Sequence, residues 1–242
     1  FLVVAIVMLG LFAYSGIWPP MVVIESGSME HPPELGVRKS YVGVIDTGDM
    51  VFVKEIDDRD DLVTYVQGEA TDRSNYGSYG DVVVYRPNGL KYWGDGSDVV
   101  PIIHRLVIWL ELNTSSVSPD HEGVDYANYS FDVPSLGLYG TTEPIMLTNY
   151  GYEGDTVTIN LGMDNGLMGY YQDRGIMPHG GFITMGDNNA PSYDQPYSGA
   201  YEPVLPEWII GKAWGELPWF GLIKLWFTGS SLAGVASNSW TC

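Results

Sequence analysis

The first 24 residues of the chain carry no charge, and residues 1–17 are almost wholly apolar. This run approaches the roughly 20 residues that an α-helix needs to cross a bilayer. Pro19 and Pro20 would end such a helix because proline interrupts the backbone ladder, and Trp18 is typical of a membrane interface. We therefore expect residues 1–20 to form a transmembrane anchor. The sequence starts without Met, so we expect its helix to continue upstream.

A cleaved secretory signal peptide is the alternative interpretation of this run. Such a peptide carries a basic segment before its apolar core and small residues at its cleavage site. No Lys or Arg precedes the apolar run, and Trp18-Pro19-Pro20 is a poor cleavage site. The sequence therefore favours a retained anchor over a removed signal.

The charge balance excludes one large class of partner. The chain of 242 residues has 30 Asp and Glu against 11 Lys and Arg, a net charge of −19. No basic track is present to neutralise phosphates, so we expect no binding of nucleic acid. The acidic residues are dispersed between apolar runs, which argues against disorder. The excess indicates a surface adapted to high salt; an ordinary acidic protein remains the alternative.

Short β-like runs outnumber convincing helical patterns, so the sequence predicts a mainly β fold. The longest β signal covers residues 102–112, where alternation would place His104 on one face with aliphatic side chains. The runs predicted to be strands are 50–56, 81–86, 102–112, 181–185 and 208–214, with a shorter one at 156–161.

Composition divides the rest of the chain. Residues 113–178 are rich in Gly, Tyr and Asn and read as an inserted β-rich or irregular subdomain. We expect residues 21–112 and 179–221 to form one catalytic β-domain around it. The apolar segment 222–242 is expected to lie at the membrane interface or to begin a second span.

Two further patterns bear on location. Asn113 and Asn128 each begin an N-glycosylation pattern, which favours an outside location. The one cysteine, Cys242, excludes an internal disulfide, so cysteine usage says nothing about the compartment.

Four residues are candidates for chemistry. Ser28 lies where the apolar segment gives way to polar sequence, as a nucleophile at a membrane edge would; a plain turn serine is the alternative. His104 has the pKa range of a general base, or is a buried structural histidine. Asp187 suits a tight turn, and Asp194 could orient a histidine base. No two histidines have zinc-ligand spacing, so we expect no metal and no cofactor.

Four motifs follow one another along the chain. They are Ser26-Gly27-Ser28-Met29-Glu30, Gly80-Asp81-Val82-Val83-Val84-Tyr85, Ile103-His104-Arg105, and Gly186-Asp187-Asn188-Asn189 with a following Asp. In this order, from the apolar anchor to about Gly221, they resemble the motifs of type I signal peptidases. Histidine at position 104 resembles the archaeal and endoplasmic-reticulum branch, whereas bacterial enzymes carry lysine there. With the acidic composition, the source resembles a halophilic archaeon.

The resemblance implies roles for individual residues. Ser28 would be the nucleophile and His104 the general base. Asp194 would orient His104, with Asp187 as a supporting carboxylate. The Asp187–Asp194 gap is one residue longer than the family's usual spacing, which leaves open which of the two completes the triad. The resemblance also implies that Ser26 and Met29 contribute to oxyanion or substrate binding.

The chain also departs from the family pattern close to the serine. His31 and Pro32-Pro33 replace the usual proline after the Ser-Met-Glu run. An extra loop then separates Ser28 from the strand expected at 50–56, so the register near the serine is less well specified than the motif itself.

The resemblance further implies a signal-peptidase-like β-fold and removal of N-terminal signal peptides from secreted preproteins. The expected partners are signal-peptide-bearing preproteins, membrane lipid and the protein translocation machinery. The expected location is the cell membrane, as a single- or two-pass protein with its catalytic domain on the extracytoplasmic side. The alternative is a non-catalytic acidic β-rich cell-surface domain on the same anchor. A related self-cleaving or regulatory serine peptidase would use a lysine, and none lies in 102–112.

Overall fold

The computed structural model describes residues 2–31, 42–117, 124–196, 200–218 and 220. Within them the chain is mainly β, with antiparallel strand pairs and three α-helices, which confirms the predicted fold class at that level. The segment 222–242, predicted to be interfacial or to begin a second span, lies outside the described residues.

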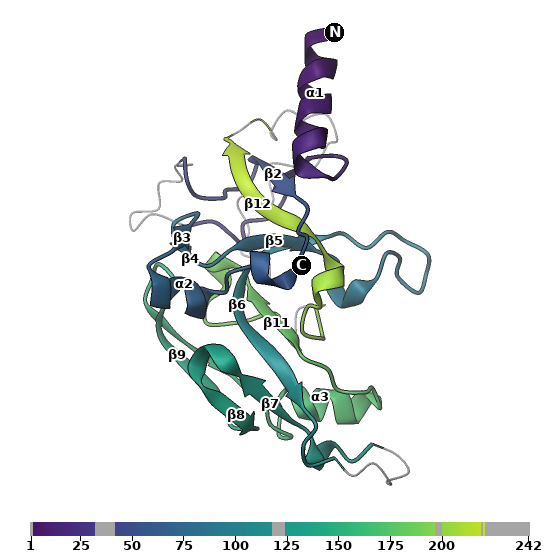
Figure 1. Ribbon diagram of the computed structural model, residues 1–242, viewed down its shortest axis with the longest axis vertical. Coiled ribbons are helices and arrows are strands. Elements are labelled where there is room, and N and C mark those ends of the chain that lie inside the picture. Colours follow the sequence, from purple (N-terminus) through teal and green to yellow (C-terminus); the bar gives the residue numbers. More distant parts are fainter. Residues whose placement is uncertain (1, 32–41, 118–123, 197–199, 219, 221–242) are drawn as a thin grey trace.

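Helix α1 (Leu2–Ser15) has 14 residues and projects from one end of the molecule (Figure 1). It ends where Gly16 adopts a φ of +77° and its N–H donates to the carbonyl of Phe12 at 3.0 Å, an ending typical of helices. None of the helices in the described ranges is both long and apolar enough to cross a membrane. The anchor over residues 1–20 stays a prediction.

One antiparallel sheet of eight strands dominates the molecule. Its strand order is β1-β2-β12-β5-β6-β7-β8, and β11 also pairs with β6. The strands are β1 (Met21–Val23), β2 (Met50–Lys54), β5 (Val82–Tyr85), β6 (Ile102–Asn113), β7 (Ser130–Val133), β8 (Leu138–Thr141), β11 (Gly181–Met185) and β12 (Ile209–Leu217).

The long strand β6 connects the parts of this sheet, but its side chains do not alternate as predicted. Opposite β11, the register shifts so that Ile183 pairs with Ile108 and Thr184 with Leu106, which leaves Val107 as an extra residue. Such a bulge reverses the faces beyond it. Leu106 therefore packs in a different hydrophobic cluster from Ile108, and the single apolar face expected for 102–112 is wrong.

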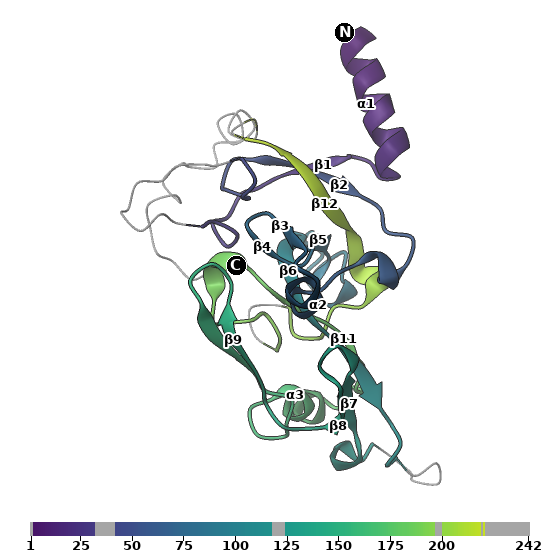
Figure 2. The same cartoon turned by 60° about the vertical axis from the view of Figure 1, so that its left-hand side comes forward.

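The segment 113–178 carries more regular structure than expected. It contains β7, β8, the hairpin β9 (Ile145–Tyr150) and β10 (Asp155–Ile159), and helix α3 (Leu167–Arg174). Figure 2 shows α3, β7 and β8 at the end of the molecule opposite α1. The segment shares one hydrophobic core with β6 and β11. The buried members of this core include Phe131, Ile145, Ile159, Leu167 and Tyr171 from the segment, Ile108 from β6 and Ile183 from β11.

Helix α2 (Tyr65–Thr71) precedes the short hairpin β3 (Ser74–Asn75) and β4 (Ser78–Tyr79). Thr64 begins α2 through a capping box, in which its hydroxyl accepts from the N–H of Gln67. Neither α2 nor α3 was predicted. The 3-10 helices are Arg59–Asp61, Pro87–Gly89, Tyr126–Asn128, Pro134–Leu136, Asp187–Asn189 and Pro206–Trp208.

Candidate active site

Ser28 lies in a tight turn just after β1. The Ile24 N–H donates to the carbonyl of Asp49 at 2.9 Å, and the Glu30 N–H donates to the carbonyl of Gly27 at 3.2 Å. Met29, predicted to bind the oxyanion or substrate, is only 1% exposed, and its side chain packs in the core. Burial of this side chain fixes the turn, so the serine next to it has a defined position.

His104 faces this turn from β6. Strand pairing places it opposite Val83 of β5, and its side chain is 3% exposed. Its Nε2 lies 3.0 Å from Ser28 Oγ. The Ser26 hydroxyl oxygen lies 3.3 Å from Ser28 Oγ. The predicted pair of Ser28 and His104 is therefore within hydrogen-bonding distance, with Ser26 beside it.

Asp194 approaches the other nitrogen of the imidazole. Its Oδ2 lies 2.6 Å from His104 Nδ1, and its side chain is 3% exposed. A carboxylate only accepts, so Nδ1–H donates to Asp194, and the lone pair of Nε2 then faces the serine hydroxyl. The structure thus joins Ser28, His104 and Asp194 in one hydrogen-bonded series, the arrangement that a histidine base requires.

Two hydroxyl groups that the sequence interpretation missed also hold Asp194. Thr184 Oγ1–H donates to Asp194 Oδ2 at 2.6 Å, and the Tyr85 hydroxyl donates to the same oxygen at 3.0 Å. Gln195 Nε2 donates in turn to Thr184 Oγ1 at 2.9 Å. These donors stabilise a buried carboxylate that would otherwise be costly. Tyr85 is the last residue of the motif that begins at Gly80, but that motif does not predict this contact.

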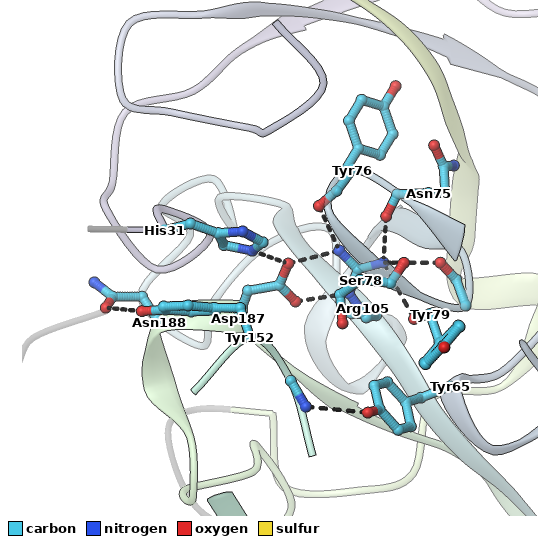
Figure 3. A network of polar contacts seen from close by, with 12 residues as sticks. His31, Tyr65, Asn75, Tyr76, Ser78, Tyr79, Arg105, Tyr152, Asp187 and Asn188 are labelled. Carbon is cyan, nitrogen blue, oxygen red and sulfur yellow. Dashed lines mark hydrogen bonds and ion pairs between the residues drawn. The ribbon is translucent and has the colours of Figure 1, made fainter. Parts of the chain in front are cut away.

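Asp187 makes a different set of contacts from Asp194 (Figure 3). Its carboxylate accepts from Arg105 Nε at 2.7 Å and from Nη2 at 2.6 Å, and its Oδ2 lies 2.8 Å from His31 Nε2. The structure therefore brings Asp194, and not Asp187, to His104. His31, noticed in the sequence only as a departure from the family pattern, belongs to this second network.

Burial and ion pairing shift the pKa values of Asp187 and Arg105 in opposite directions. Burial alone would raise the pKa of Asp187, but Arg105, assisted by His31, outweighs it and lowers the pKa below its ordinary value. Burial alone would lower the pKa of Arg105, but Asp187 outweighs it and the pKa is raised. Both groups therefore remain charged, each compensated by the other.

The guanidinium of Arg105 is fully buried and also organises the β3–β4 hairpin (Figure 3). Its Nη1 donates to the carbonyls of Asn75 and Gly80 at 2.8 Å each, and its Nη2 donates to the carbonyl of Tyr76 at 3.2 Å. These bonds satisfy a cation that would otherwise be unpaired in the interior. The residue next to the histidine thus ties the hairpin to Asp187.

The Gly186–Asn189 turn touches the serine directly. The Asn188 N–H donates to the carbonyl of Ser28 at 2.8 Å, and its side-chain Nδ2 donates to the carbonyl of Gly27 at 3.0 Å. The sequence predicted a tight turn here, but not its pairing with the serine turn, which lies far away along the chain.

A metal centre finds no support in the part of the chain that the structure describes. No group of three or more His, Cys, Asp or Glu side chains there is arranged to hold an ion. The side chains that meet at the site are a hydroxyl, an imidazole and a buried carboxylate in one hydrogen-bonded series.

Fold and site together define a mainly β protein with a serine–histidine–aspartate series at the junction of a β-turn and a sheet. Comparison with models of protein families finds no match to this chain, and no curated protein matches it.

Proposed function

We propose that this protein is a serine endopeptidase with a signal-peptidase-like β-fold, which removes N-terminal signal peptides from secreted preproteins. The observation that carries the proposal is the series in which Ser28 Oγ lies 3.0 Å from His104 Nε2, and His104 Nδ1 lies 2.6 Å from Asp194 Oδ2. A nucleophile, its base and an orienting acid at these distances match the geometric requirements of acyl transfer.

The first half of the reaction forms an acyl-enzyme. Ser28 Oγ attacks the carbonyl carbon before the scissile bond while His104 Nε2 takes the hydroxyl proton. Asp194 stabilises the resulting imidazolium without accepting a proton itself. The tetrahedral intermediate then collapses, the C–N bond breaks, and His104 returns the proton to the leaving amine. Water then attacks the acyl ester while His104 takes its proton. The bond to Ser28 Oγ breaks, the carboxylic acid leaves, and His104 returns the proton to Ser28.

The oxyanion of the intermediate would be stabilised by two donors of the same turn. These are the backbone N–H of Ser28 and the hydroxyl of Ser26, whose oxygen lies 3.3 Å from Ser28 Oγ. One oxyanion donor typically contributes about 3 kcal/mol to the transition state. Ser26→Ala should therefore lower kcat by roughly two orders of magnitude or less.

The substrate would bind in an extended conformation. Strand β1 stands at the end of the sheet order and leads into the Ser28 turn, so its outer edge could pair with a peptide by β-augmentation. Shallow pockets would select small side chains before the cut, as in secretory signals. A membrane anchor over residues 1–20 would confine enzyme and membrane-held preprotein to one plane, on the extracytoplasmic side, and raise their effective concentration.

Cleavage of a preprotein in membranes at high salt tests the proposal. Wild type should release the mature protein, and Ser28→Ala and His104→Ala should not. Ser97→Ala, at an exposed serine, is the matched control and should cleave like wild type. Retained cleavage by Ser28→Ala would reject the assignment. Absence of cleavage by folded wild type, with no labelling of Ser28 by a fluorophosphonate, would instead favour a non-catalytic acidic cell-surface domain.

A further inference from the structure

Tyr152 lies at the tip of the β9–β10 hairpin, in the segment 113–178, beside His31 and Asn188 (Figure 3). Its ring stacks on His31 with centroids 4.3 Å apart and an interplanar angle of 20°. Its hydroxyl donates to Asn188 Oδ1 at 3.5 Å. Burial, with Glu153 close by, raises the pKa of Tyr152 to about 12, so the hydroxyl keeps its proton at neutral pH.

Both residues that Tyr152 contacts are tied to the serine turn. Asn188 donates to the carbonyls of Gly27 and Ser28 through its side chain and its backbone N–H, respectively. The bond from Tyr152 occupies the amide oxygen of Asn188, which keeps the amide nitrogen directed at Gly27. Tyr152 therefore selects the side-chain orientation in which Asn188 holds the turn.

His31 secures the chain three residues after Ser28. Its Nε2 lies 2.8 Å from Asp187 Oδ2, and its ring lies between Tyr152 and the β3–β4 turn. A Cβ at Gly77 would lie only 2.9 Å from His31 Cε1, so this turn leaves the ring no spare room. The chain on one side of Ser28 is thus fixed by His31, while Asn188 holds the serine itself.

The hairpin tip that carries Tyr152 is itself fixed to α2. The Gly151 N–H donates to the Tyr65 hydroxyl at 3.1 Å, and the ring of Tyr65 packs on that of Tyr150 with centroids 4.0 Å apart. Tyr150 is almost fully buried. A rigid support of this kind is what a positioning side chain needs.

We propose that Tyr152 is a positioning residue for Ser28, and that the β9–β10 hairpin is consequently part of the active site. This role rests on the proposed function, because it concerns the reactivity of the serine. Tyr152 touches neither the serine nor the histidine base in the contacts above; it acts through Asn188 and His31. Segment 113–178 thereby contributes to catalysis as well as to the hydrophobic core.

Substitutions at Tyr152 separate its two contacts. Tyr152→Phe keeps the stacking on His31 and removes the hydroxyl, and should lower the rate of Ser28 acylation by a fluorophosphonate about threefold to fivefold. Tyr152→Ala removes both contacts and should lower it about tenfold to a hundredfold. Tyr139→Ala, at an exposed tyrosine of the same segment, should react like wild type. With a preprotein substrate, the loss should fall on kcat, with KM changed less than about twofold.

Amide hydrogen exchange provides a readout that does not depend on activity. The Asn188 N–H is bonded to the carbonyl of Ser28, so its exchange should accelerate in Tyr152→Ala and remain unchanged in Tyr139→Ala. Unchanged exchange, or an unchanged acylation rate in an active protein, would overturn the role of Tyr152. If wild type neither cleaves nor acylates, the proposed function fails, and with it the catalytic role, even where exchange shows that Tyr152 holds the turn.

Discussion

Gly186 lies directly against His104. A Cβ at position 186 would come within 2.9 Å of His104 Nε2 and within 2.5 Å of the carbonyl oxygen of Ser28. The backbone φ of Gly186 is −71°, which any residue adopts, so glycine is required here for space and not for conformation. The turn that holds the serine can reach the histidine only because position 186 has no side chain.

Gly186→Ala should therefore uncouple Ser28 from His104. The carbonyl of Ser28 belongs to the backbone and cannot rotate away, so the turn itself must shift. A misplacement of about 1 Å can lower a rate by about 10²-fold, and we expect kcat/KM to fall by about that factor. The matched control is Gly94→Ala, where the new Cβ meets nothing within 4 Å. Equal activity of the two variants in preprotein cleavage would contradict the steric account.

The two aspartates should respond differently to substitution by asparagine. Asp194→Asn presents an amide to His104 and favours the wrong imidazole tautomer, which should lower kcat about 10⁴-fold. The Thr184 and Tyr85 hydroxyls, which contact the same oxygen of Asp194 as His104 does, can rotate to accept from this amide, so the fold should survive. Preprotein cleavage and thermal unfolding of the same sample measure the two effects, and a variant that keeps substantial activity would remove Asp194 from the triad.

Asp187→Asn should act mainly on stability. It leaves the guanidinium of Arg105 buried without its counter-charge, which typically costs about 3–5 kcal/mol. For a chain of this size, that corresponds to a fall in Tm of roughly 6–20 °C. Any residual folded protein should retain more activity per molecule than Asp194→Asn. The reverse order, with Asp194→Asn unstable and Asp187→Asn merely inactive, would show that their roles are exchanged.

Ser28, His104 and Asp194 were predictable individually, but most of their contacts, and the supporting hydroxyls of Thr184 and Tyr85, were not. Ser28 and His104 stand out because each lies in a short motif, and the order of these motifs suggested that they meet. Spacing along the chain left Asp187 and Asp194 undecided, since either could reach a histidine. The path of the chain after β11 decides between the two aspartates. It folds back so that the Asp194 N–H donates to the carbonyl of Thr184, which places the Asp194 side chain beside His104.

The fold was predicted best where local sequence dominates. β-branched and aromatic runs located β2, β5, β6, β11 and β12 to within a few residues. The bulge at Val107 was not predictable, because it arises from pairing between β6 and β11 rather than from either strand alone. Helix α3 was missed for a similar reason: its buried side chains pack on a core assembled from distant strands, so local periodicity carries little of the signal.

Tyr85→Phe probes the hydrogen bonds that hold Asp194. Its hydroxyl donates to Asp194 Oδ2 at 3.0 Å in a buried setting, and bonds to charged groups contribute about 1.5–3 kcal/mol. With one donor fewer to the buried carboxylate, the unfolding free energy should be lower by about that amount. Denaturant unfolding measures this loss, and a variant as stable as wild type would contradict this role for Tyr85.

His179 gives the fold a pH dependence that is separate from catalysis. Burial alone would lower the pKa of His179, but Glu202, at 2.9 Å from its Nε2, and the carbonyl of Gly180 outweigh burial and raise the pKa. A raised folded-state pKa means that the contribution to stability is fully present below about pH 6.5, the unfolded value. It is lost as the pH rises through the folded value. This contribution to the unfolding free energy should thus decline as the pH rises above about 6.5.

Glu202→Gln isolates the contribution of this pair from that of the other histidines. The variant keeps a side chain of the same size but removes the charge that favours protonated His179. Denaturant unfolding at pH 6, 7 and 8 should show wild type to be more stable than Glu202→Gln at the lowest pH, with the two curves converging as the pH rises. A difference between the two proteins that is constant over this range would mean that His179 does not change its protonation there. The pair would then contribute a hydrogen bond of constant strength between the residues just before β11 and the loop before β12.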